Sequence, residues 1–218
     1  MKSSSLIENY SSSKKLSKLT EFLNAATHGF ALIMSIYGII LLVQKSLYDQ
    51  KRFYPFLIFG ISLIILYAAS TLFHSLIFTS AKKYLQKIDH ISIYVLIAGT
   101  YTPYALVGVG GYKGIILLIL IYSICLAGII YKFVFLGRFK ILETLAYIAI
   151  GWISILFYHP LIKTLGRNGV NLLILGGVSY TLGTIFYGWR SLPFHHVIWH
   201  LFVMAGSLSM FMSIYYYL

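Results

Sequence analysis

The most regular feature of the sequence is a succession of seven long apolar runs separated by short polar connections. Each run is close to or longer than the roughly 20 residues that a helix needs to cross the hydrocarbon of a membrane. This pattern predicts an all-α integral membrane protein, a seven-transmembrane helix bundle that forms one domain over residues 21–218. The Ser- and Lys-rich residues 1–20 lack the apolar core of a signal peptide, and we expect a flexible cytoplasmic tail there. The seven predicted spans are 24–44, 53–79, 91–110, 114–135, 141–159, 169–188 and 195–217.

The distribution of charge predicts how the bundle lies in the membrane. Only 10% of the residues are charged, against roughly 25% in soluble domains. Of the 17 Lys and Arg residues, 11 lie in the tail and in the second, fourth and sixth connections between the apolar runs, which are the even-numbered ones. The positive-inside rule then places the N-terminus in the cytoplasm and, after seven crossings of the plasma membrane, Leu218 outside. Because the basic residues sit in short connections between apolar runs, we expect no nucleic-acid partner.

Six of the seven histidines fall in the half of the predicted bundle that faces the cytoplasm. His74 lies near the end of the second run, whereas His196 and His200 open the seventh run. His196 and His200 are four residues apart, so on a helix they lie one turn apart on one face. His159 alone falls on the opposite side. Ionisable groups inside a membrane bundle are costly, so this shared depth predicts a functional site at the inner end.

His74, His196 and His200 are candidate ligands of one metal ion. Zn²⁺ in catalytic sites commonly has three protein ligands and a fourth position left open for water. Two imidazoles one helical turn apart can share one ion, and His74 would complete the set. The alternative is that each histidine makes its own hydrogen bonds at the depth of the lipid head groups. The common depth of the three favours the metal site.

Two further polar residues lie at the same depth and are candidate catalytic residues. Ser70 lies one turn deeper than His74 on the same face, where its hydroxyl can hydrogen-bond a water or a substrate carbonyl. Alternatively, Ser70 bonds to the backbone of its own helix. Asp89 lies at the first turn of the third helix, where it can cap the helix N-terminus or hold and deprotonate the water at the metal. Both roles of Asp89 are compatible.

Glu21, Asn24 and His28 follow one another at helical spacing and share one face of the first predicted helix. Glu21 and Asn24 are also suited to cap the start of that helix. His28 lies two turns into an apolar run and needs a partner there. We interpret the three residues as a supporting hydrogen-bond network, not as direct ligands of the metal.

Two features outside this set bear on packing. Pro103 cannot donate a backbone hydrogen bond to the Gly99 carbonyl, so we expect it to kink the third helix and widen a cavity. Glu143 lies close in sequence to Arg138 and Lys140, and we expect an ion pair with one of them at the surface, which contributes little stability.

The motifs at these positions resemble those of the hemolysin III family, the bacterial branch of the progestin and adiponectin receptor superfamily. The resemblance covers nearly the whole chain from Glu21 onward. It implies a seven-helix bundle with a cytoplasmic N-terminus and a zinc ion held by His74, His196 and His200. The motifs that carry it are Glu21-x-x-Asn24-x-x-Thr27-His28, Ser70-Thr-Leu-Phe-His74, Asp89-His90, Ala98-Gly-Thr-Tyr-Thr-Pro103, Tyr180-Thr-Leu-Gly-Thr-Ile-Phe-Tyr187 and His196-Val-Ile-Trp-His200.

The same resemblance implies several functions. It places Asp89 and Ser70 around the water at the zinc, and similar members include receptors with ceramidase activity. We expect a zinc-dependent hydrolase that acts on a membrane lipid or other fatty-acyl amide or ester. One alternative is a pore-forming cytolysin, the activity from which the family takes its name. Another is a membrane sensor whose zinc is structural. The sequence makes no prediction of the oligomeric state.

Overall fold

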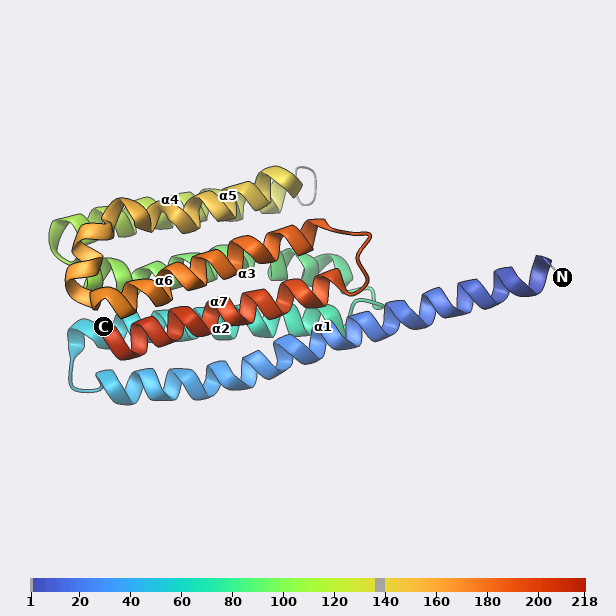
Figure 1. Ribbon diagram of the computed structural model, residues 1–218, viewed down its shortest axis with the longest axis horizontal. Helices are drawn as coiled ribbons and strands as arrows, with labels where there is room; N and C mark the ends of the chain where they lie inside the picture. The colour runs from blue at the N-terminus through green and yellow to red at the C-terminus, as the bar shows by residue number, and fades with distance from the viewer. Residues whose placement is uncertain (1, 136–139) are drawn as a thin grey trace.

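The computed structural model describes residues 2–135 and 140–218, with side chains for 15–135 and 141–218. The described residues form an all-helical bundle of elongated, roughly parallel or antiparallel helices, from which the N-terminal part of α1 projects (Figure 1). In chain order the elements are α1 (Lys2–Ser46), α2 (Gln50–Ser75), α3 (Lys82–Pro103), the π-helical η1 (Tyr104–Val109), α4 (Gly111–Phe135), α5 (Lys140–Trp152), the 3₁₀-helical η2 (Ile153–Phe157), α6 (Tyr158–Gly188) and α7 (His195–Tyr217).

Six helical stretches among the described residues are long and apolar enough to cross a membrane. The all-α membrane fold is therefore confirmed. Five of the stretches each correspond to one predicted span, but Ile141–Gly188 is a single stretch of 48 residues. It contains both of the runs predicted at 141–159 and 169–188. Figure 1 draws α5 and α6 as separate rods of the bundle, and the backbone of Gly166 leaves the helical region with φ 65° and ψ 178°.

The first helix begins well before the predicted apolar run. α1 runs without interruption from Lys2 to Ser46, a length of 45 residues. The Ser- and Lys-rich segment contains neither Gly nor Pro. These are the two residues that most strongly disfavour a helix interior, so nothing in the local sequence ends the helix before the apolar run.

Glycines let α2 approach its neighbours closely. A Cβ atom at Gly99 of α3 would lie 2.2 Å from the Ser62 hydroxyl of α2, and one at Gly60 would lie 2.6 Å from Ile39 of α1. Small residues at helix interfaces allow such close packing within membranes. The contacts fix α2, and with it His74, between α1 and α3.

Close packing at glycine also positions α7. A Cβ atom at Gly183 of α6 would lie 2.8 Å from the Trp199 ring, and one at Gly206 would lie 2.8 Å from the Tyr180 ring. Trp199 directly precedes His200 in the first turns of α7. The approach of α6 to α7 therefore fixes the part of α7 that carries the candidate ligands.

The helix changes from α-helical to π-helical at the position where a kink was predicted. α3 ends at Pro103, and the chain continues as the π-helical η1. Thr102 Oγ1 donates a hydrogen bond of 2.9 Å to the Ala98 carbonyl, which satisfies one backbone acceptor in this region. A π-helical turn is wider than an α-helical one and occurs often at functional sites. Tyr104, the first residue of η1, lines the internal cavity described below.

Candidate metal centre

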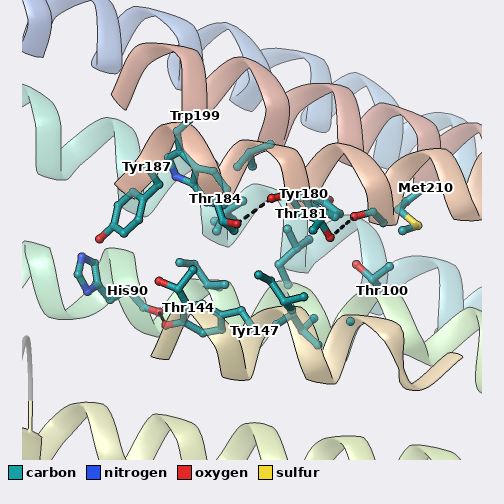
Figure 2. Close-up of a pocket in the computed structure, with 18 of the residues that line it drawn as sticks. His90, Thr100, Thr144, Tyr147, Tyr180, Thr181, Thr184, Tyr187, Trp199 and Met210 are labelled. Atoms are coloured by element: carbon teal, nitrogen blue, oxygen red, sulfur yellow. Dashed lines mark hydrogen bonds between the residues drawn. The ribbon is translucent and has the colours of Figure 1, made fainter. Parts of the chain in front are cut away.

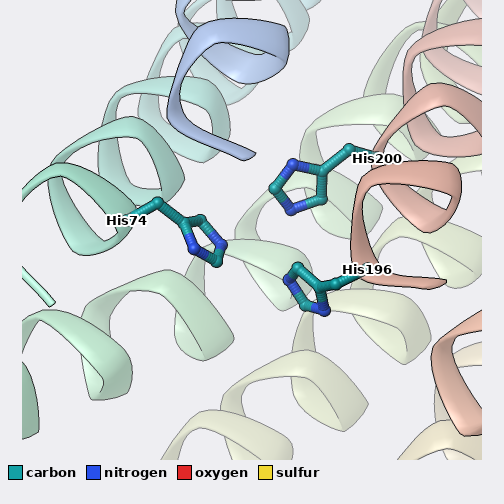
Figure 3. A group of neighbouring side chains, drawn as sticks. All are labelled: His74, His196 and His200. Carbon is teal, nitrogen blue, oxygen red and sulfur yellow. The ribbon is translucent and has the colours of Figure 1, made fainter. Parts of the chain in front are cut away.

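Three histidines from two helices meet at the end of the bundle where α2 ends and α7 begins. His74 lies in the last turn of α2, and His196 and His200 lie one turn apart at the start of α7. One ring nitrogen from each residue lies within 4.8 Å of the other two. Figure 3 shows the three rings grouped around a common space. The structure therefore brings together the three predicted ligands, in an arrangement that could hold one metal ion.

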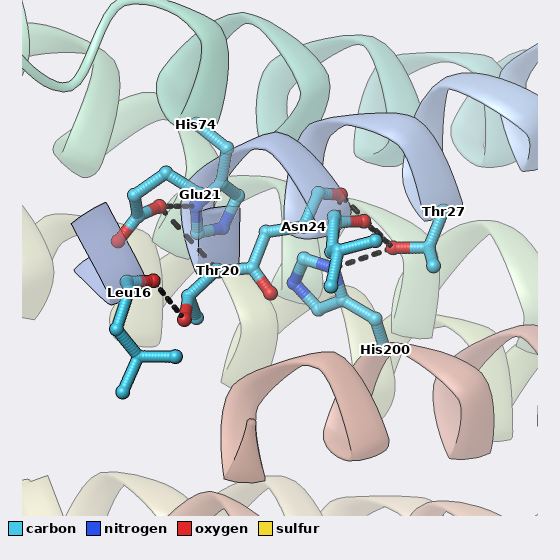
Figure 4. Close-up of polar contacts among 8 residues, drawn as sticks. Leu16, Thr20, Glu21, Asn24, Thr27, His74 and His200 are labelled. Carbon is cyan, nitrogen blue, oxygen red and sulfur yellow. Dashed lines mark hydrogen bonds and ion pairs between the residues drawn. The ribbon is translucent and has the colours of Figure 1, made fainter. Parts of the chain in front are cut away.

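The two nitrogens of His74 differ in what they contact. Nδ1 lies 2.6 Å from Oε2 of Glu21 on α1 (Figure 4). Nε2 is buried and has no hydrogen-bond partner among the described residues. A buried polar atom without a partner is uncommon and needs an explanation. The carboxylate on Nδ1 fixes the ring so that Nε2 is the nitrogen available to a metal.

His200 is oriented in a similar way by the backbone of α1. Its Nδ1 lies 3.3 Å from the Asn24 carbonyl oxygen and 3.3 Å from the Thr27 hydroxyl. The Asn24 side chain donates a hydrogen bond of 3.4 Å to Oε2 of Glu21 (Figure 4). One face of α1 therefore contacts the outward nitrogen of both His74 and His200, an arrangement typical of histidines that bind a metal through the opposite nitrogen.

His28 contacts the site through its ring. The His28 ring stacks on that of His200, with centroids 3.5 Å apart and planes inclined by 12°. The ring of Tyr67 packs edge-on against His28 at 5.0 Å. Both ring nitrogens of His28 are buried without a hydrogen-bond partner among the described residues. The predicted hydrogen-bond network thus includes Glu21 and Asn24, whereas His28 supports His200 by stacking.

Ser70 and Asp89 lie on the wall of an internal cavity of about 170 Å³ that also reaches His196 and His200. Ser70 is only 2% exposed. The alternative role of Asp89 as a helix cap is wrong, because α3 begins at Lys82 and its N-cap residue is Ala81. Asp89 lies inside α3 instead, where it lines the cavity.

The rest of this cavity is mostly apolar and aromatic. Figure 2 shows side chains from several helices around the pocket, with Tyr147 and Thr144 on one side and Trp199 and Tyr180 on the other. The Tyr180 hydroxyl is hydrogen-bonded to Ser207 Oγ at 2.9 Å. The cavity therefore joins a polar end, at the histidines, to an apolar interior that can accept a hydrocarbon chain.

The prediction of a surface ion pair for Glu143 is wrong. Glu143 is 6% exposed and forms an ion pair with Lys132 of α4, which is 1% exposed. The side chains of Arg138 and Lys140 lie outside the described residues, so an ion pair with either of them stays a prediction. Sequence proximity did not point to Lys132, which lies on another helix, α4. An acidic residue within an apolar run was the available signal for burial.

The donor set fits a transition metal. Three imidazoles, two of them almost fully buried, would supply three nitrogen ligands to such an ion. The unpartnered Nε2 of His74 is the observation that favours a bound ion over three independently hydrogen-bonded histidines. His159 is exposed and lies on α6, so it does not contribute to this cluster.

Comparison with known proteins gives a match to one family over most of the chain. The sequence model of the family described as haemolysin-III related matches residues 16–211. The chain is 44% identical over 199 residues to a hemolysin-3 homolog of Bacillus subtilis (strain 168), covering 90% of this chain and 93% of that protein. It is 41% identical over 211 residues to hemolysin-3 of Bacillus cereus, covering 94% and 96%. It is 29% identical over 203 residues to the human monocyte to macrophage differentiation factor, covering 89% and 83%.

Proposed function

The chain belongs to the haemolysin-III-related family of multi-pass membrane proteins, and we propose that it is a zinc-dependent hydrolase of a lipid amide or ester. His74, His196 and His200 hold one Zn²⁺. The observation that carries this function is the buried, unpartnered Nε2 of His74 within a cluster of three imidazoles at the polar end of an apolar cavity.

The proposed topology has seven crossings with a cytoplasmic N-terminus. The stretch Ile141–Gly188 has 48 residues, about twice what one crossing requires. α5 with η2 forms the fifth crossing and the later part of α6 forms the sixth. The excess of basic residues in the tail and the even-numbered connections supports this orientation, which places the metal centre near the cytoplasmic face.

In the proposed reaction the acyl group is transferred to water, and each residue around the metal has a separate role. Zn²⁺, when bound, polarises a carbonyl oxygen and makes water a stronger acid. The Asp89 carboxylate takes a proton from the attacking water, whose oxygen forms the new bond to the acyl carbon. The Ser70 hydroxyl donates a hydrogen bond to the carbonyl oxygen as negative charge develops on it.

The reaction is completed by the departure of the amine or alcohol. The bond between the acyl carbon and the leaving nitrogen or oxygen breaks, and Asp89 returns its proton to that atom. The products are a carboxylic acid and an amine or alcohol. The apolar part of the cavity binds the acyl chain and excludes water from it, while Glu21 keeps the His74 ring in its orientation.

Two relatives carry the name hemolysin, which makes a pore-forming cytolysin the second candidate function. A pore needs polar faces along the full length of its helices. The exposed side chains of the spanning helices are mainly large and apolar, and the ionisable side chains of the bundle interior are concentrated near one end. These observations favour the hydrolase. A sensor with a structural zinc is the third candidate and differs from the hydrolase only in lacking turnover.

The proposed hydrolase is tested by purifying the protein with its metal and incubating it with membrane lipid extracts. Lipid analysis should show release of free fatty acid by the wild-type protein and not by a His74→Ala variant. Zinc retention without any fatty-acid release from a broad set of lipid amides and esters would favour the sensor.

A further inference from the structure

A second cluster of ionisable side chains lies inside the bundle, separate from the three histidines. Lys132 of α4 forms an ion pair with Oε2 of Glu143 of α5, and its ammonium lies 3.1 Å from Nδ1 of His90 on α3. The lysine is 1% exposed and the glutamate 6%. We refer to Lys132, Glu143 and His90 as the Lys132 cluster.

Stability does not explain the Lys132 cluster. The desolvation of two buried charges offsets most of their attraction, so an apolar pair of similar volume is often as stable. Ionisable residues within membrane helices are instead associated with ligand, ion or proton sites. Moreover, Oε1 of Glu143 is buried and has no hydrogen-bond partner among the described residues. One carboxylate oxygen of the cluster therefore has unused capacity to accept a hydrogen bond.

The Lys132 cluster shares a cavity with the metal centre. All three of its residues line the same cavity as Ser70 and Asp89. His90 directly follows Asp89, so their Cα atoms are only about 3.8 Å apart. Figure 2 shows His90 beside Thr144 at one end of the pocket, with the Tyr187 hydroxyl directed toward it from the opposite wall.

We propose that the Lys132 cluster is a head-group subsite that binds a neutral hydrogen-bond donor, a hydroxyl or an amide N–H, of a lipid in this cavity. The charges of the cluster favour a neutral donor over a charged group. Glu143 already neutralises the Lys132 ammonium, and its unpartnered oxygen would repel a free carboxylate or phosphate. Lys132 would repel an amine in its protonated form. A neutral donor satisfies Oε1 of Glu143 without adding charge to the membrane interior.

If Asp89 serves the acyl carbonyl, as in the proposed hydrolase on which this placement rests, the donor lies on the amine or alcohol part of the same lipid, because Asp89 and the Lys132 cluster line one cavity.

Equilibrium binding of a matched pair of amides tests the subsite. The probes are a long-chain N-(2-hydroxyethyl) amide and the N-propyl amide of the same fatty acid, measured with the full-length protein in detergent. We expect the wild type to bind the hydroxylated amide about tenfold more tightly, as for one buried hydrogen bond. A double variant, Lys132→Met with Glu143→Leu, should lose this preference and keep its zinc. Lys45→Met is the matched control, since Lys45 contacts the Tyr215 carbonyl outside the cavity and should leave the preference unchanged.

Two outcomes overturn the subsite: equal binding of the two amides by the wild type, or an unchanged preference in the double variant. If the double variant does not fold, Glu143→Gln replaces it. This change preserves volume and weakens the acceptor, so the preference should fall severalfold, and an unchanged preference again contradicts the subsite. Because only equilibrium binding is measured, absent turnover combined with a clear preference would refute the hydrolase and leave the subsite intact.

Discussion

Oε2 of Glu21 lies 2.6 Å from Nδ1 of His74, a contact that joins α1 to the end of α2. The opposite nitrogen of the same ring, Nε2, is buried without a partner beside His196 and His200. One carboxylate thereby determines which nitrogen of His74 is available to a metal. Residues that hold a ligand in this way contribute to metal affinity without touching the metal.

Replacement of Glu21 by glutamine should therefore weaken metal binding. The loss of a carboxylate behind a histidine ligand typically costs 10–100-fold in affinity. We expect Glu21→Gln to show a reduction of this size in competition with a chromogenic zinc chelator, with the helical circular dichroism unchanged. Asp49→Asn is the control, because Asp49 lies at the opposite end of the bundle and caps α2 through the Lys51 amide. Equal affinity of Glu21→Gln and the wild type would show that the contact with His74 is not part of the metal site.

Asp89→Asn should separate metal binding from turnover. Asparagine keeps the shape of the side chain but cannot accept a proton from water at neutral pH. We expect zinc content close to that of the wild type and a loss of fatty-acid release of about 100-fold or more. His200→Ala should lose both properties. Full activity of Asp89→Asn with an identified lipid substrate would remove Asp89 from the catalytic residues.

The sequence predicted the three-histidine cluster because of the spacing of His196 and His200 and the depth that they share with His74. His196 and His200 are separated by one helical turn, and His74 ends a different apolar run at the same side of the membrane. These regularities depend only on helix geometry and on the fixed thickness of the membrane that each helix crosses. They also indicated that Glu21 and Asn24 lie on the same face of α1, where the structure has them beside His74 and His200.

Contacts that depend on how one helix packs against another were not predicted. The choice of Lys132 as the partner of Glu143 follows from the approach of α4 to α5, which sequence proximity does not encode. The stacking of His28 on His200 likewise depends on the rotation of α1 against α7. α3 begins at Lys82 because the polar residues ahead of its apolar run are also helical. Asp89 therefore lies inside the helix and does not cap it.

The topology can be measured with a reporter enzyme that is active only outside the cytoplasm. With seven crossings and a cytoplasmic N-terminus, fusion after Leu218 should give an active reporter, and fusion before Met1 should give none. A second fusion in the connection between α6 and α7, at Arg190, should be inactive. An active reporter at Arg190 would place the metal centre on the outer side and contradict the proposed orientation.

The pore-forming alternative predicts leakage of a trapped dye from vesicles that contain the purified protein. We expect vesicles with the wild-type protein to retain the dye as well as protein-free vesicles do. Leakage that increases with the amount of protein, and that is the same for the wild type and a His200→Ala variant, would make the cytolysin the main function. Leakage that appears only with hydrolysis of the vesicle lipids would instead be a product of the enzyme.

Zinc content of the purified protein tests the metal centre most directly. We predict about one Zn²⁺ per chain, the stoichiometry of a single three-histidine site. His74→Ala, His196→Ala and His200→Ala should each abolish binding or weaken it strongly, whereas His159→Ala should retain the ion because His159 is exposed on α6 outside the cluster. Wild-type protein without bound zinc after purification in its presence, or equal loss of zinc in His159→Ala and His196→Ala, would contradict the site.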